Sequence, residues 1–279
     1  MPHDIRRHPA QIPVFTHMSF AVPLSSSGNA SSPETAHRNG GRLRDALELT
    51  IGYALIVSVL WTEGPAQRVC YWSALVVVLG ISIARRRPLR EMGFTLGGFL
   101  RSLWVPAVAL LLALIEAAVA AHLHTLHRNA VPMLLHFRFA GYALWALVQQ
   151  FLLQDYFFAR LRRLVPATPT GTRAAAVVSA ALFALAHLPS PILTALTLVW
   201  GWLSCLLFLR YRNLYTLGIA HAILGITIAL TVPGRIDHHM RVGLAYLHYH
   251  PHWPPYGRMH GPHASGQQPI QLPPLPSAH

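Results

Sequence analysis

Charged residues are scarce in this sequence, since only 11% of its 279 residues are Asp, Glu, Lys or Arg. A soluble domain normally carries about a quarter charged residues. Hydrophobic residues make up 53% of the chain, and several apolar runs approach or exceed the roughly 20 residues that a helix needs to cross a bilayer. The scarcity of charge therefore argues against several soluble domains and predicts a single integral membrane domain with tails.

Lysine is absent, and all 22 basic residues are Arg, which leaves a formal net charge of +13. A positive total of this size is common in proteins that bind nucleic acids. Most of the arginines, however, stand in short clusters between apolar runs, as residues that determine membrane topology do. We therefore expect the lipid bilayer as a partner and no nucleic acid.

Cysteine is also rare, and the two cysteines, Cys70 and Cys205, fall in or beside apolar runs without the spacing of metal ligands. This placement predicts buried small hydrophobic residues and argues against a disulfide framework. The first 42 residues lack the continuous apolar stretch that a signal peptide needs. Their richness in Pro, Ser, Asn, Gly and Arg predicts a disordered N-terminal tail, 1–42.

Seven apolar segments follow this tail and predict an all-α, polytopic bundle of about seven transmembrane helices over residues 43–233. The expected segments are 46–61, 70–84, 100–121, 139–158, 174–188, 192–209 and 214–232. With the N-terminus on the cytoplasmic side, sixteen arginines fall in inner segments and six in outer ones. This bias predicts a multi-pass protein of the cell membrane with a cytoplasmic N-terminus.

The remaining residues, 234–279, are rich in His and Pro. Such tracts can bind metal ions. The alternative, which the mixture with Pro and Gly favours, is a disordered C-terminal tail whose histidines are incidental.

Among the ionisable residues inside apolar segments, four stand out: Glu116, Asp155, His187 and His221. A charge in the hydrocarbon costs several kcal/mol unless it is paired or hydrated, so each is a candidate functional residue. At about 1.5 Å of rise per residue, Asp155, His187 and His221 can converge in the inner half of the membrane. Glu116 fits a structural role better, as the partner of a neighbouring helix. The alternative is that Glu116 is the acid of the site and Asp155 is structural.

A carboxylate and two imidazoles in a dry cavity have two uses that the residues alone leave open. The carboxylate and one His can activate a water molecule, while the other His stabilises the oxyanion of a tetrahedral intermediate. This is peptide hydrolysis without a covalent intermediate. The same three side chains, Asp155, His187 and His221, can instead bind a divalent metal such as zinc.

Three short motifs follow one another on three of the expected helices. They are Asp155-Tyr156-x-x-x-Arg160, Phe183-x-x-x-His187 and His221-x-x-x-Gly225. In order and spacing they resemble the CPBP family of intramembrane proteases, which contains the CAAX prenyl endopeptidases and bacteriocin-processing relatives. The family pattern is Glu-Glu-x-x-x-Arg, Phe-x-x-x-His and His-x-x-x-Asn/Asp. The stretch 88–94 is similar to a segment that these proteins carry after an early span.

The resemblance implies an intramembrane endopeptidase that hydrolyses a membrane-associated or lipidated peptide. Asp155 would be the general base for water, aided by His187. His221 would stabilise the oxyanion or bind the same water, and Arg160 would orient Asp155.

This sequence departs from the family pattern at three positions. Asp155 and Tyr156 stand where the family has two Glu residues, and Gly225 stands where it has Asn or Asp. Asp is shorter than Glu by one methylene, and a base misplaced by about 1 Å can cost on the order of a hundredfold in rate. These three departures therefore support an alternative function, in which the protein is a catalytically inactive membrane scaffold or chaperone for peptides or partner proteins.

Overall fold

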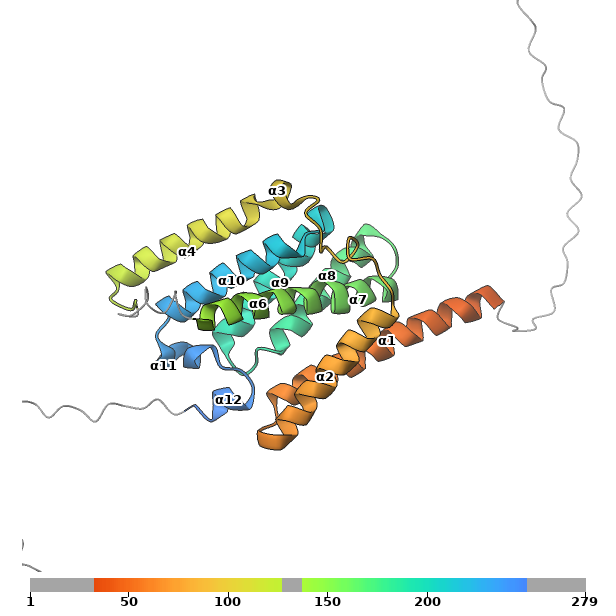
Figure 1. Ribbon diagram of the computed structural model, residues 1–279, viewed down its shortest axis with the longest axis horizontal. Helices are drawn as coiled ribbons and strands as arrows, with labels where there is room; N and C mark the ends of the chain where they lie inside the picture. Colours follow the sequence, from red (N-terminus) through yellow and green to blue (C-terminus); the bar gives the residue numbers. More distant parts are fainter. Residues whose placement is uncertain (1–32, 127–136, 250–279) are drawn as a thin grey trace, which may run out of the picture. The chain divides into compact units, whose positions relative to one another are not determined.

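The computed structural model describes residues 33–126 and 137–249 (Figure 1). These residues form α-helices, one π-helical segment and one short 3-10 helix, and no strand occurs among them. The all-α fold class predicted from the sequence is confirmed. The chain divides into two units, Met1–Asn39 and Gly40–His279, and the side chains of the candidate site belong to the second unit.

Each of the seven apolar segments coincides with a helix or a pair of consecutive helices. The elements up to the end of the last apolar segment are α1 (Pro33–Leu60), α2 (Gly64–Ala84), α3 (Phe99–Ser102), α4 (Trp104–His122), α6 (Phe137–Phe151), the π-helix η1 (Leu152–Phe158), α7 (Ala159–Leu164), α8 (Pro169–Leu185), α9 (Pro191–Tyr211) and α10 (Leu214–Thr231). The short helices α11 (Gly234–Asp237), η2 (His238–Met240) and α12 (Leu244–Leu247) follow.

Polar caps explain where the last three long helices begin. The side chains of Thr168, Ser190 and Asn213 accept hydrogen bonds from backbone N–H groups in the first turns of α8, α9 and α10. In α8 and α9 a proline follows the cap, where its missing N–H costs no hydrogen bond. The sequence therefore fixes the start of the two helices, α8 and α10, that bring His187 and His221 to the site.

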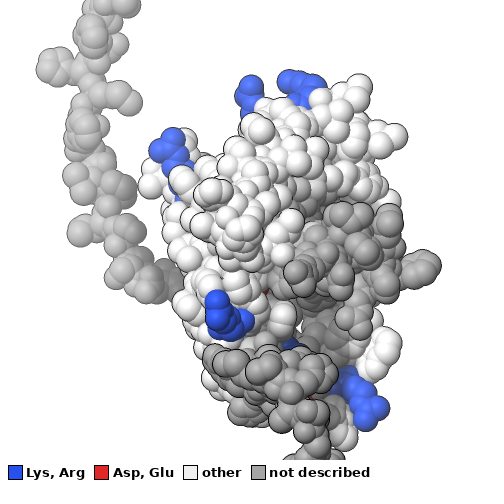
Figure 2. Space-filling view, turned by 90° about the vertical axis from the view of Figure 1, so that its left-hand side faces the viewer, with Lys and Arg blue, Asp and Glu red and all other residues white. Residues whose placement is uncertain are grey.

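Four helical stretches of the described chain are long and apolar enough to cross a membrane: α2, α3 with α4, α9 and α10. The apolar helix α8 is shorter. On α4, large side chains such as Leu111 and Leu114 are exposed, and Figure 2 shows a broad uncharged face with scattered arginines. The exposure of apolar side chains is typical of contact with lipid. The protein is therefore a membrane protein, and the count of about seven spans stays a prediction.

Small residues bring the helices of the bundle close together. Helix α10 packs against both α4 and α6, and α8 packs against α9 (Figure 1). Between α8 and α9, a Cβ atom at Gly201 would lie 3.2 Å from the Cα atom of Ala180. Such close approach of backbones is the usual basis of helix association in membranes.

Helices α6, η1 and α7 are consecutive, and the residues at both junctions keep helical backbone angles. Every residue of η1 from Leu153 to Phe158 is buried. A π-helical turn inside an α-helix widens the helix and occurs frequently at functional sites. Here Asp155, with which the first sequence motif begins, lies on the π-helical segment, and this segment packs against α8 and α9.

Both expected tails are shorter than the sequence predicted. Helix α1 begins at Pro33, inside the predicted tail 1–42. Residues 234–249, placed in the predicted tail 234–279, form short helices and contact the bundle, because the Gly243 N–H donates to the Leu188 carbonyl at 2.8 Å. The rest of both predicted tails lies outside the described residues.

Candidate active site

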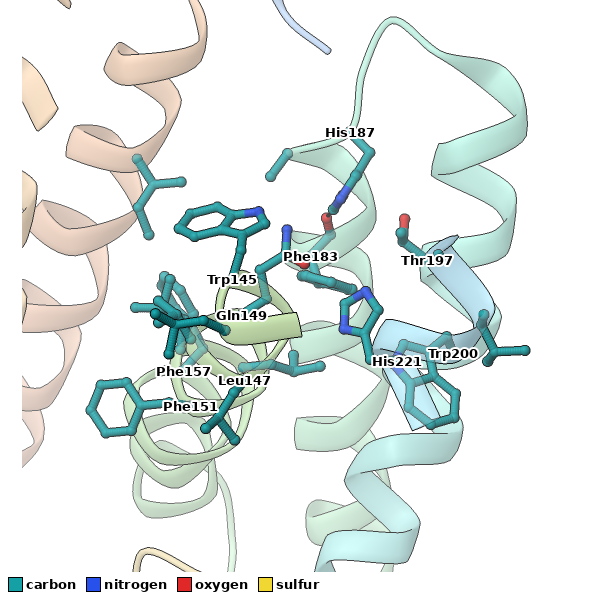
Figure 3. Close-up of a pocket in the computed structure, with 18 of the residues that line it drawn as sticks. Trp145, Leu147, Gln149, Phe151, Phe157, Phe183, His187, Thr197, Trp200 and His221 are labelled. Carbon is teal, nitrogen blue, oxygen red and sulfur yellow. Dashed lines mark hydrogen bonds between the residues drawn. The ribbon is translucent and has the colours of Figure 1, made fainter. Parts of the chain in front are cut away.

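Two imidazoles from different helices meet at one aromatic ring. His187 lies in the turn that follows α8, and His221 lies in the middle of α10. The ring centroid of Phe183 lies 4.9 Å from that of His187 and 5.9 Å from that of His221. Figure 3 shows both imidazoles beside Phe183. The structure therefore brings together two of the residues that the motifs singled out.

The hydrogen bond that His187 makes to the backbone shows which of its two ring nitrogens carries the proton. Its Nδ1 lies 2.7 Å from the backbone carbonyl of Phe183. A carbonyl oxygen only accepts hydrogen bonds, so Nδ1 carries the proton and donates. In the neutral ring, Nε2 then has a lone pair that can accept a proton or bind a metal ion.

The opposite assignment holds for His221, which is buried. The amide nitrogen Nε2 of Gln150 lies 3.1 Å from its Nδ1. The orientation of this amide follows from its other end, because Oε1 of Gln150 accepts a hydrogen bond from Gln154 at 3.4 Å. Nδ1 of His221 therefore accepts, and the neutral ring carries its proton on Nε2.

The two rings thus offer complementary groups, a basic Nε2 on His187 and an N–H donor on His221. Both side chains line a cavity of about 1910 Å³ whose other walls are mostly apolar. Trp145 and Gln149 of α6 and Thr197 and Trp200 of α9 are among these walls (Figure 3). A base and a hydrogen-bond donor at the wall of an apolar cavity can together serve acyl-transfer chemistry.

Asp155 is buried on η1, where its carboxylate is held by an arginine. Oδ1 accepts a hydrogen bond from Nη1 of Arg87 at 3.2 Å, and Oδ2 is buried without a hydrogen-bond partner among the described residues. No ion pair or hydrogen bond joins this carboxylate to His187 or His221 in that part of the chain. The predicted trio is therefore brought together only in part.

The motif arginine, Arg160, has a different carboxylate partner from the one predicted. Its guanidinium pairs with Glu48 of α1 at 3.0 Å and contacts Asp155 only through that residue's backbone carbonyl, at 3.4 Å. It also lies 3.8 Å from the ring centre of Tyr156, whose hydroxyl donates to the Glu48 carbonyl at 2.7 Å. Position 52 is Gly, and a Cβ atom there would collide with Tyr156.

A second acidic residue of α1 extends this charged cluster. Asp45 accepts two hydrogen bonds from Arg163, at 2.7 and 2.8 Å, and one from Arg85 at 2.6 Å. Burial by itself would raise the pKa of Asp45, but the hydrogen bond and charge of Arg163, with the charges of Arg85 and Arg160, outweigh burial and hold the pKa below its ordinary value. The carboxylate is therefore ionised at neutral pH.

Glu116 has the structural contact expected for it. Its Oε1 accepts a hydrogen bond from the Thr231 hydroxyl at 2.6 Å, which links α4 to the end of α10. The expected contact of Glu116 with a neighbouring helix is therefore present, while its alternative role as the acid of the site stays a prediction.

The structure does not place Asp155, His187 and His221 together as ligands of one metal ion. The described residues contain no group of three His, Cys, Asp or Glu side chains placed to hold a metal ion. This finding covers Asp155, His187 and His221, and also those histidines of the His-rich C-terminal segment that the structure describes.

Sequence reasoning missed three residues that contact the motifs: Glu48, Arg87 and Gln150. Glu48 is an ionisable residue of the first apolar segment, so the criterion that selected Glu116 could also have selected it. Arg87 was counted only as a topology determinant. For Gln150 no signal existed, because its contact with His221 depends on the packing of α6 against α10.

The fold and the site define an α-helical, multi-pass membrane protein with two imidazoles at an apolar cavity. Residues 131–227 match the family model described as Rce1-like, type II CAAX prenyl endopeptidase Rce1-like. This match spans all three motifs and confirms the family resemblance seen in the sequence. No curated protein and no solved structure matches the chain. The family supports a function of the CAAX-type intramembrane protease kind.

Proposed function

We propose that this protein is an intramembrane endopeptidase that hydrolyses a membrane-associated or lipidated peptide. The observation that carries the proposal is the opposite hydrogen bonding of the two imidazoles, which leaves a basic Nε2 on His187 and an Nε2–H donor on His221. Both groups open onto one apolar cavity.

In this proposal His187 is the general base. A water molecule at its Nε2 loses a proton to that nitrogen while the water oxygen attacks the peptide carbonyl carbon. Negative charge then builds up on the carbonyl oxygen, where Nε2–H of His221 donates a hydrogen bond. The protonated His187 finally gives its proton to the leaving nitrogen as the C–N bond breaks, so no covalent enzyme intermediate forms.

Asp155 and Arg160 act as positioning residues in this scheme. Asp155 holds η1 to the loop after α2 through Arg87, at 3.2 Å. Arg160 holds the following turn to α1 through Glu48, at 3.0 Å. Because Gln150 lies two residues before the start of η1, both ion pairs fix the helical stretch that orients His221. This role for Asp155 differs from that of general base, which the motif resemblance implies.

The substrate is a peptide that enters from the bilayer. The cavity is walled mostly by apolar side chains, so an acyl or prenyl chain gains about 0.8 kcal/mol for each methylene that it buries there. The match to the CAAX prenyl endopeptidase family supports a prenylated peptide as the first substrate to test. The N-terminus is proposed to be cytoplasmic, as the arginine distribution indicates.

The first prediction is that the purified full chain in nanodiscs cleaves an internally quenched, S-prenylated Cys-a-a-X peptide. The double variant His187→Ala/His221→Ala should be inactive and reports any contaminating protease. His248→Ala is the matched control, because His248 is an exposed histidine that pairs with Glu63 outside the cavity. If neither this peptide nor a library of membrane peptides is cut, the proposal is wrong.

A non-catalytic membrane scaffold is the second candidate, and the separation of Asp155 from the imidazoles favours it. A scaffold of this kind binds the prenylated peptide without cutting it. Binding by the wild type without cleavage, together with cleavage by a variant that carries Asp155→Glu and Gly225→Asn, would support the scaffold over the enzyme. This variant also needs Tyr142→Ala, because a Cβ atom at position 225 would collide with the Tyr142 side chain.

A further inference from the structure

Helices α6 and α10 approach each other closely at two glycines of α10. A Cβ atom at Gly218 would meet Leu147, and one at Gly225 would meet Tyr142. As residue numbers rise along α10 they fall along α6, so the two helices run antiparallel. Both glycines lie on the α10 face that packs against α6, which places the Tyr142 side chain over the backbone of Gly225.

The hydroxyl of Tyr142 stands where a side chain at position 225 would begin. Of all atoms outside α10 near a Cβ built on Gly225, the Tyr142 hydroxyl oxygen is the nearest. Residues four apart on a helix have Cβ atoms about 5–6 Å apart on one face. A Cβ atom at position 225 would lie about 5–6 Å from the Cβ atom of His221, so the Tyr142 hydroxyl contacts the same face of α10 that carries His221.

Within the described part of the chain, no side chain or backbone group competes with a ligand for this hydroxyl. Tyr142, Gly225 and His221 all line the cavity. The Tyr142 hydroxyl has no hydrogen-bond partner among the residues that the structure describes. In contrast, the hydroxyl of Tyr53, another residue of the cavity wall, donates to the Leu182 carbonyl at 3.1 Å.

We propose that Tyr142 is a further catalytic residue, whose O–H joins Nε2–H of His221 in donating to the oxyanion of the peptide carbonyl. Two convergent donors are the usual composition of an oxyanion hole. A phenol is a suitable donor because its O–H is polarised and its ring is rigid. The glycine at 225 admits the hydroxyl to this place, since any Cβ atom would exclude it. This inference rests on the proposed endopeptidase function.

The second prediction concerns Tyr142→Phe, which removes the hydroxyl and keeps the ring. We expect kcat for the S-prenylated peptide to fall by about 10²–10³-fold with KM nearly unchanged, as for the loss of one oxyanion donor. Tyr53→Phe is the matched control, because it removes a hydroxyl from the same cavity that is already bonded to backbone. Its kcat should stay within about threefold of the wild type if only oxyanion donors affect the chemical step.

A rescue experiment separates catalysis from packing. Tyr142→Ala vacates the space beside Gly225, and the additional change Gly225→Asn fills it with an amide donor grown from α10. The double variant should recover at least about tenfold in kcat over Tyr142→Ala, because the amide N–H replaces the phenol as donor. Gly225→Ala in the Tyr142→Ala background fills space without a donor and should give no recovery.

The outcomes distinguish the two proposals. No cleavage by the wild type overturns the endopeptidase function itself. Cleavage by the wild type with equal kcat in Tyr142→Phe, or equal recovery with Ala and Asn at position 225, overturns the role of Tyr142 and leaves the function standing.

Discussion

The two histidines at the cavity differ in what they can do, although both imidazoles lie beside the ring of Phe183. The Phe183 carbonyl fixes the proton of His187 on Nδ1, and the Gln150 amide fixes that of His221 on Nε2. The sequence indicated both residues, since histidine inside an apolar segment is a functional candidate. It could not assign their roles, because these depend on partners in space.

Asp155 shows the limit of motif reasoning at single residues. The motif placed a carboxylate on the correct helix, but the side chain points to Arg87 rather than to the imidazoles. Asp is shorter than Glu, and its reach is therefore limited by the backbone of η1. Only the packing of the loop after α2 could show which partner lies within that reach.

The third prediction tests the pair formed by Asp155 and Arg87. Arg87→Gln leaves a buried carboxylate without its cation and should lower the free energy of unfolding by about 1–3 kcal/mol. The double variant Arg87→Gln/Asp155→Asn should regain part of this loss, as read from thermal unfolding in detergent. It should also keep measurable cleavage at a rate below that of the wild type, because Asp155 positions η1 and takes no part in proton transfer.

Two results would contradict this account of Asp155 and Arg87. Loss of all cleavage in Asp155→Asn at unchanged thermal stability would return Asp155 to the role of general base implied by the motif. No regain of stability in the double variant would show that the Arg87 contact does not stabilise the fold.

At the scale of elements, the docking of α1 onto η1 and α7 depends on charge. Glu48 and Asp45 of α1 face Arg160 and Arg163 of α7, and Arg85 at the end of α2 contacts both acids. The apolar periodicity predicted the helices but not this contact. The π-helical segment could not be predicted either, because its hydrogen bonds depend on tertiary packing.

The fourth prediction concerns the pH dependence of this docking. The pKa of Asp45 is lower in the folded protein than its ordinary value of 3.8, so its ionised form favours folding. This contribution is present above pH 3.8 and is lost as the pH falls through the lower pKa of the folded state. Thermal unfolding of the nanodisc sample should therefore show declining stability below about pH 4.

Asp45→Asn should be less stable than the wild type at neutral pH and should decline less on acidification. Glu63→Gln is the control, because Glu63 is an exposed acid that pairs with His248. Equal acid sensitivity in Asp45→Asn and in the wild type would show that Asp45 does not carry this effect.

At the scale of the whole molecule, the sequence predicted the helical segments well. Long apolar runs leave the backbone few alternatives in a membrane, and the seven segments all became helices. The tails were predicted less well, because composition does not show that residues 234–249 bond to the turn before α9. The cavity was beyond prediction, since its walls come from helices distant in sequence.

The central claim is that His187 and His221 work as one catalytic site. The most direct test is the single-turnover rate of cleavage of the S-prenylated peptide by wild type, His187→Ala, His221→Ala and the double variant. Each single change should lower the rate by about 10²–10⁴-fold. The double variant should fall no more than about tenfold further, because residues that act as a unit are not additive. The claim would be contradicted if the rate losses of the two single variants multiplied in the double variant. It would also be contradicted if the single variants cleaved at the wild-type rate.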